Sequence, residues 1–150
     1  MVTIRDAGPG DVDAVMRLVR NSADSQGALD QLCIDAPALR AEMFGDRPRV
    51  HALVALDGDR PVGVAVYFFT FSTWVSVHGI HLEDLYVDPA WRRQGIGAAL
   101  IRALVDVAAA HECRRVQWFV QRHNDGARRF YESVGALAAS DWIVMHLDRA

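Results

Sequence analysis

The stretch Arg92 to Leu100 reads RRQGIGAAL and joins two arginines and two glycines to the start of an apolar helical pattern. The first N–H groups of a helix have no partner within the helix, and together with the helix dipole they bind anions. Glycine lets an anion approach the backbone closely, and arginine adds charged donors. The stretch therefore predicts a cradle for a diphosphate. The alternative is a plain turn between a strand and a helix, with solvated arginines.

Two common nucleotide-binding motifs do not fit this stretch. A P-loop would need Gly-Lys followed by Ser or Thr, and the stretch has no such sequence. The dinucleotide fingerprint would need a third glycine where Leu100 stands. The predicted diphosphate therefore belongs to another class of ligand.

Strand-like runs that alternate with helical patterns must position this cradle. We expect strands at Val2–Arg5, Val50–Leu56, Pro61–Phe71, Ile80–Val87, Val116–Val120 and Trp142–Leu147, with Val116–Val120 buried. We expect helices after a cap at Asp11, at Ala36–Phe44, from Ile96 to about Ala110, and from Ala127 to Val134. The segment Asn21 to Asp35 is polar and is expected to be irregular. This order predicts a single α/β or α+β domain over residues 1–150.

The composition is that of an ordinary globular protein. Of the 150 residues, 51% are hydrophobic and 23% are charged, and the net charge of −3 gives no reason to expect nucleic acid as a partner. No apolar run is long enough to span a bilayer, and the first residues do not resemble a signal peptide. Cys33 and Cys113 are expected to be buried thiols in a reducing cytoplasm. The six histidines show no metal-binding spacing.

Two motifs resemble those of the GNAT-type N-acetyltransferases. Arg92-Arg93-Gln94-Gly95-Ile96-Gly97 resembles the Arg/Gln-x-x-Gly-x-Gly/Ala signature with which that family binds the pyrophosphate of acetyl-CoA. The later run from Asn124 through Ala127, Phe130 and Tyr131 to Gly135-Ala136 resembles the second motif of the family. The resemblance implies the GNAT fold, a central, mostly antiparallel mixed sheet flanked by helices. It also implies acetyl-CoA as co-substrate, with no metal.

The runs LEDLYV and YFFTFSTW, with Cys113 and Trp118, are similar to the spermidine/spermine N-acetyltransferase branch and its bacterial relatives. This similarity implies direct transfer of acetyl to a small primary amine: a polyamine, an amino acid or a lysine-like compound. In that branch an aromatic-acidic pair holds the cationic chain, whereas this chain has Ser25 and Gln26 there. Which amine accepts the acetyl group therefore stays open.

The resemblance also assigns roles to residues. Tyr131 is the expected acid for the departing thiol. Glu83 is the expected base, acting through water. Neighbouring strand residues point to opposite faces, so at most one of Glu83 and Asp84 is expected to face the site. Glu83 is preferred, because the matching position in the similar branch lies at the amine. His81, two residues before Glu83, is either a proton relay or an ordinary strand histidine. The expected substrate-binding residues are Glu83, Asp84, Trp74 and Asp141. The expected cofactor-binding residues are Leu85, Tyr86, Val87, Arg92, Arg93, Gln94, Gly95, Ile96, Gly97, Ala98, Asn124 and Ala127.

Two other functions stay open. One is acetylation of a protein lysine or N-terminus, which would require an open and shallow acceptor groove. The other is a non-catalytic module that senses acetyl-CoA, which would need neither Tyr131 nor Glu83. Homodimerisation is implied by the resemblance, with the apolar run WIVMHL as a possible contact surface.

Overall fold

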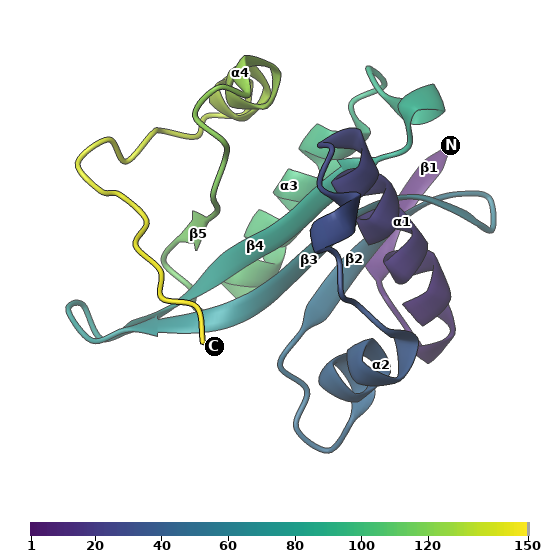
Figure 1. Cartoon of the computed structure of the whole chain (residues 1–150), viewed down its shortest axis with the longest axis horizontal. Coiled ribbons are helices and arrows are strands. Elements are labelled where there is room, and N and C mark those ends of the chain that lie inside the picture. The colour runs from purple at the N-terminus through teal and green to yellow at the C-terminus, as the bar shows by residue number, and fades with distance from the viewer. Residues whose placement is uncertain (150) are drawn as a thin grey trace. The chain divides into compact units, whose positions relative to one another are not determined.

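Five strands in the described part of the chain pair in the order in which they occur (Figure 1). They are β1 (Val2–Asp6), β2 (His51–Asp57), β3 (Arg60–Ser72), β4 (Val77–Val87) and β5 (Val116–Gln117). Strands β1 to β4 pair antiparallel with one another, and β5 pairs parallel with β4. The expected central, mostly antiparallel mixed sheet flanked by helices is confirmed.

The computed structural model describes residues 1–149 in two units. The first unit, Met1–Phe119, contains the sheet with helices α1 (Val12–Ser25), α2 (Ala36–Phe44) and α3 (Ile96–Ala110). Short 3₁₀ turns lie at Pro9–Asp11, Leu29–Gln31 and Pro89–Trp91. The second unit begins at Val120 and contains α4 (Asp125–Ser133). Each unit is described by itself.

One face of the sheet is covered by α1 and α2. Apolar residues recur every three or four positions in α1, so that they form one buried stripe against β2, β3 and β4. Each large side chain that is fully buried in this way contributes roughly 1.5–3 kcal/mol. This core consists of Val12, Val15, Leu18, Val19, Leu39, Met43, Ala52, Val54, Leu56, Val64, Val66 and Tyr86.

Helix α3 covers the opposite face. Its buried residues Ile96, Leu100 and Leu104 are spaced four apart. A Cβ atom added to Gly63 of β3 would lie 3.4 Å from Cδ1 of Leu100, so α3 approaches the sheet closely at this glycine. Even-numbered residues in the centre of β3 therefore face α1 and α2, whereas Gly63 and its odd-numbered neighbours face α3.

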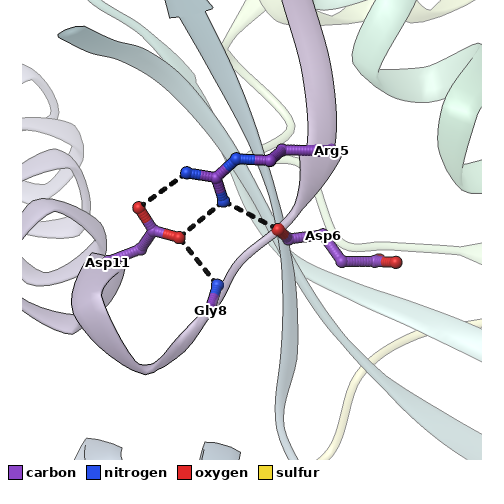
Figure 2. Close-up of polar contacts among 4 residues, drawn as sticks. All are labelled: Arg5, Asp6, Gly8 and Asp11. Carbon is purple, nitrogen blue, oxygen red and sulfur yellow. Dashed lines mark hydrogen bonds and ion pairs between the residues drawn. The ribbon is translucent and has the colours of Figure 1, made fainter. Parts of the chain in front are cut away.

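The entry into α1 is held by Arg5 and Asp11 (Figure 2). The Arg5 guanidinium donates to both carboxylate oxygens of Asp11, at 2.6 and 3.1 Å, and the N–H of Gly8 donates to the same carboxylate at 2.7 Å. The bond from Arg5 is the main cause that lowers the pKa of Asp11 below its usual value. Asp11 occupies the expected N-cap position of α1, but its side chain binds these groups and not the first N–H groups of the helix.

Several expected elements differ from the structure. Helix α1 continues to Ser25, so the segment expected to be irregular begins five residues later than its predicted start at Asn21. The expected strand Val116–Val120 is reduced to Val116–Gln117 and is not buried, because β5 pairs with β4 at two positions only. The expected strand Trp142–Leu147 is absent from the described residues, where Trp142, Ile143, Val144, Met145 and Leu147 are exposed. A strand forms only where its N–H and C=O groups find a partner, and apolar composition alone does not supply one.

The second unit keeps the expected helix around Phe130 and Tyr131. The Asn124 side chain caps α4 by accepting a hydrogen bond of 3.1 Å from the N–H of Ala127. Gly135 follows the helix with a φ of 93°, a conformation that favours glycine. The predicted start and end of this helix are therefore confirmed to within two residues.

Candidate active site

The centre of the site is an irregularity in the pairing of β3 with β4. Val66 lies opposite Asp84, but the next residue of β3, Tyr67, lies opposite Leu82. Glu83 therefore has no opposite residue and is the extra residue of a β-bulge.

The bulge changes the faces to which the acidic side chains belong. Asp84 is opposite Val66, whose side chain belongs to the core beneath α1 and α2. Nε2 of His81 lies 3.3 Å from Oε2 of Glu83, and the His81 ring stacks on Phe68, which is on the same face of β3 as Val66. Glu83 and Asp84 therefore share one face, and the expectation that at most one of them reaches the site is wrong. A regular strand alternates its side chains, whereas the extra residue of a bulge interrupts the alternation.

The two carboxylates differ in their surroundings. Burial, together with the neighbouring charge of Glu83, raises the pKa of Asp84 to about 6. The Glu83 side chain is 57% exposed. The Glu83 carboxylate is thus accessible to solvent, whereas the Asp84 carboxylate is desolvated and has a pKa of about 6.

Beyond the bulge, the edge of β4 that would face β5 is unpaired. Among residues 1–149, β5 pairs with β4 only at Ile80 and His81. Backbone groups on this edge near Leu85 are therefore available to a ligand, as a further strand would use them, whereas the backbone oxygen of Val87 already accepts a hydrogen bond from Nε of Arg92. Leu85, Tyr86 and Val87 are among the residues expected to bind the cofactor.

The edge of β4 leads to the predicted diphosphate cradle. Arg93 and Gly95 both have positive φ angles, 64° and 78°, in the loop before α3. Residues with a left-handed backbone conformation, alternating with residues in the ordinary right-handed conformation, turn successive N–H groups toward one point. Such an arrangement is called an anion-binding nest. The first intrahelical bond runs from the N–H of Ala99 to the C=O of Gly95, so the N–H groups of Ile96, Gly97 and Ala98 precede it and have no acceptor in the helix.

The Arg92 side chain mainly stabilises the loop before α3. Its Nε donates to the backbone oxygen of Val87 at 2.8 Å, and its guanidinium lies 5.3 Å from the centre of the Tyr86 ring. Trp91 is fixed by a hydrogen bond of 3.1 Å from Nε1 to Asp57. Arg93 and Gln94 are exposed beside the nest. Of the two expected cationic donors, Arg93 is therefore the one with an unoccupied guanidinium in the described contacts.

Asp88 is a structural residue of the site that directly follows the expected strand Ile80–Val87. Its buried carboxylate lies 3.3 Å from Nη1 of Arg17 and accepts a hydrogen bond of 3.3 Å from Asn21, both on α1. Its N–H donates to the backbone oxygen of Val62. Asp88 thus fixes the loop before α3 to α1 and β3. No spacing in the sequence indicates contacts across 67 and 71 residues.

The other expected site residues lie in the turn between β3 and β4 and in the second unit. Trp74 lies in the turn between β3 and β4 and is 85% exposed. Tyr131 lies in α4 beside the Phe130 ring, and burial raises its pKa above the usual value. Asn124 and Ala127 form the cap of α4, and Asp141 is exposed in a turn of the second unit. The roles of these residues remain predictions.

Two further expectations concern cysteines and metal ions. Cys33 is exposed and Cys113 is partly exposed, so the expectation of buried thiols is wrong. Within residues 1–149 no group of three or more His, Cys, Asp and Glu side chains is placed to hold a metal ion. A reaction without a metal stays a prediction. None of the described helices has both the length and the apolar character needed to cross a membrane.

Comparison with known proteins identifies the class to which this site belongs. Residues 20–136 match the family described as the Acetyltransferase (GNAT) family. Thialysine N-epsilon-acetyltransferase of Bos taurus is 38% identical over 90% of this chain and 84% of its own length. Spermidine/spermine N(1)-acetyltransferase-like protein 1 of Homo sapiens is 33% identical over 97% of this chain, but the match covers 22% of that protein.

Solved structures agree on the fold. An aminoglycoside acetyltransferase from an uncultured soil metagenomic sample superimposes with a TM-score of 0.81 at 22% identity, over 99% of this chain and 95% of that one. A possible acetyltransferase from Clostridium difficile 630 gives a TM-score of 0.83 at 20% identity, over 100% and 99% of the two chains. The chain belongs to the GNAT family and is an acetyltransferase. GNAT acetyltransferases use acetyl-CoA as co-substrate, and the nest before α3 suits its diphosphate.

The nest gives a first prediction. We expect Gly95→Ala to lower the free energy of unfolding by about 1 kcal/mol, because an L side chain is strained at positive φ. A Cβ at Gly95 meets no atom within 4 Å, so crowding is excluded as a cause. The dissociation constant for acetyl-CoA should rise at the same time. Urea unfolding and calorimetric titration measure the two effects.

Gly10→Ala is the matched control, because its Cβ also meets nothing within 4 Å and its φ lies outside the positive range. Equal stability changes in the two variants would contradict the assigned role of the left-handed backbone at Gly95.

A second prediction follows from the raised pKa of Asp84. The pKa of Asp84 is about 6 in the folded chain and near 3.8 ordinarily, so the folded chain binds its proton more tightly than the unfolded chain does. The stability that this tighter binding gives is fully present below about pH 4 and is lost as the pH rises through 6. Asp84→Asn removes the buried charge. We therefore expect this variant to be more stable than the wild type at pH 8, by about 2 kcal/mol, and no more stable at pH 4.

Denaturant unfolding at the two pH values measures this difference. Asp106→Asn, at an exposed position of α3, is the control and should leave the stability unchanged at both. A stability gain for Asp84→Asn that is equal at pH 4 and pH 8 would rule out the buried charge as its cause.

Proposed function

We propose that this acetyltransferase transfers the acetyl group of acetyl-CoA directly to a small primary amine. The observation that carries the proposal is the bulge in β4, which gives two adjacent carboxylates, Glu83 and Asp84, to one face of the sheet. Two carboxylates favour a cationic acceptor by long-range attraction and by direct contact with an ammonium group. They stand beside the unpaired edge of β4 that leads to the nest.

In the proposed reaction Glu83 acts as the base. An amine attacks a carbonyl carbon only after it has lost a proton, and an exposed carboxylate takes that proton through water. Asp84 is desolvated and mostly ionised at neutral pH, with a pKa of about 6, and we assign it to binding the ammonium group. The preference for Glu83 as base and Asp84 as binding residue thus follows from their different exposure.

Tyr131 is the proposed acid. The thiolate of CoA leaves when the C–S bond breaks, and a phenol is able to protonate it. The sequence pattern of the family's second motif and the intact cap of α4 at Asn124 support this role. On the cofactor side we assign the backbone of Leu85, Tyr86 and Val87 to the pantetheine arm and the N–H groups from Gly95 to Ala98 to the diphosphate. Arg93 and Gln94 are assigned to the phosphates, Arg92 to holding the loop, and Asn124 and Ala127 to the arm near Tyr131.

Among small amines, we favour an amino acid with a terminal side-chain amine over a long polyamine. Three relatives named for thialysine are 36–38% identical to this chain and a fourth is 26% identical, and one named for L-ornithine is 29% identical over 57% of it. The side chains of Ser25 and Gln26 both bond back to Ser22 on α1, and neither carries a charge for a distant ammonium group. Trp74 and Asp141 are the proposed distal contacts of the acceptor.

Two alternatives predict different behaviour. A protein lysine or N-terminal acetyltransferase would acetylate peptides and neglect free amino acids. A sensor module would bind acetyl-CoA without turnover, and the presence of Tyr131 and Glu83 argues against it, because binding alone requires neither. We also propose that the enzyme is cytoplasmic, which suits its unpaired, accessible cysteines.

The third prediction tests the reaction. We expect release of CoA thiol from acetyl-CoA with lysine-like amino acids, and less with polyamines and peptides. Tyr131→Phe and Glu83→Gln should each lower kcat by about 100-fold or more, because general acids and bases contribute 10²–10⁴. Tyr67→Phe, which removes a buried hydroxyl from β3, is the control and should retain activity.

Turnover of peptides alone would favour the protein acetyltransferase. Tight binding of acetyl-CoA with no turnover of any acceptor would favour the sensor. Wild-type activity of Tyr131→Phe would contradict the proposed acid.

The fourth prediction concerns assembly. We propose a homodimer, supported by the resemblance to the spermidine/spermine branch and by the exposed apolar residues between Trp142 and Leu147. Sedimentation velocity should give twice the mass of the 16.6 kDa chain. Ile143→Lys should shift the protein toward the monomer, whereas His146→Lys, at a neighbouring polar position, should have little effect. A monomer at micromolar concentration would contradict the proposal.

A further inference from the structure

His81 is held more firmly than the carboxylate beside it. Its ring stacks on Phe68 of β3 at 4.9 Å and meets the ring of Phe119 edge-on at 4.9 Å. The side chain is 9% exposed. Contacts on two sides leave the imidazole little freedom to change rotamer.

Glu83, in contrast, is the extra residue of the bulge and has a largely exposed side chain. A solvated glutamate samples several rotamers, and fixing one of them costs conformational entropy. Its described partner is His81, whose Nε2 lies 3.3 Å from Oε2. The restrained imidazole therefore limits where the carboxylate of Glu83 lies.

We propose that His81 is a positioning residue for Glu83, which it holds through the contact of Nε2 with Oε2 at 3.3 Å. This inference rests on the proposed function, in which Glu83 is the base.

The surroundings of the imidazole suit this role. The rings packed against it from β3 and from the segment after β5 belong to Phe68 and Phe119 and carry no charge. Glu83 and, next to it, Asp84 are the ionisable groups that β4 adds on this face.

The experiment compares His81→Phe and His81→Gln with the wild type on the best acceptor found. Phe retains the aromatic packing, so the fold should be kept, and circular dichroism and thermal unfolding check this. Gln retains a donor for the Glu83 carboxylate. We expect His81→Phe to lower kcat at least tenfold, with the KM for acetyl-CoA within twofold of wild type. His81→Gln should restore part of the loss.

His78→Gln is the matched control, because His78 lies on the same strand and its ring contacts Phe71, not an acidic residue. It should leave kcat unchanged. An unchanged kcat in folded His81→Phe would overturn the proposal.

A double-mutant cycle separates action through Glu83 from a general effect on the fold. In a Glu83→Gln background, His81→Phe should lower kcat by less than twofold. Multiplication of the two single losses would overturn the proposal. If Glu83→Gln alone has the wild-type rate, the base assigned in the proposed function is contradicted. If it loses activity while His81→Phe does not, only the inference about His81 fails.

Discussion

One extra residue in β4 is the constraint on which the site depends. The register shift opposite Val66 and Tyr67 leaves Glu83 unpaired and turns it to the same face as Asp84. Without that bulge the two carboxylates would lie on opposite faces of the sheet, one of them beneath α3. The bulge thus places two neighbouring carboxylates on one face of the sheet, and one residue of β4 loses its pairing with β3.

The same strand connects the acidic group to the cradle before α3. Beyond the bulge β4 lacks a partner on one edge, and it ends at Asp88, which is tied to α1 by Arg17 and Asn21. The loop that follows is held by Arg92 on the backbone of Val87. Residues 83–98 therefore hold the proposed acceptor side and the proposed cofactor side in sequence along one support.

Much of the fold was predictable from local patterns. Helix α2 and helix α3 begin and end where the helical pattern predicts, at Ala36–Phe44 and Ile96–Ala110. The strands at Val116 and Trp142 were not predicted correctly. Apolar runs of that length indicate that a segment is able to pair, but pairing depends on a partner edge that lies elsewhere in the chain.

The sequence by itself determined the family, the cradle and the candidate acid and base, because these depend on residue types at short fixed spacings such as Arg92 to Gly97. Only the tertiary structure decided that Glu83 and Asp84 share a face, that His81 is clamped by Phe68 and Phe119, and that Asp88 fixes the loop. The physical reason is the same in each case. A bulge and a contact across 67 residues arise from the pairing of distant segments, and no local pattern encodes the register of that pairing.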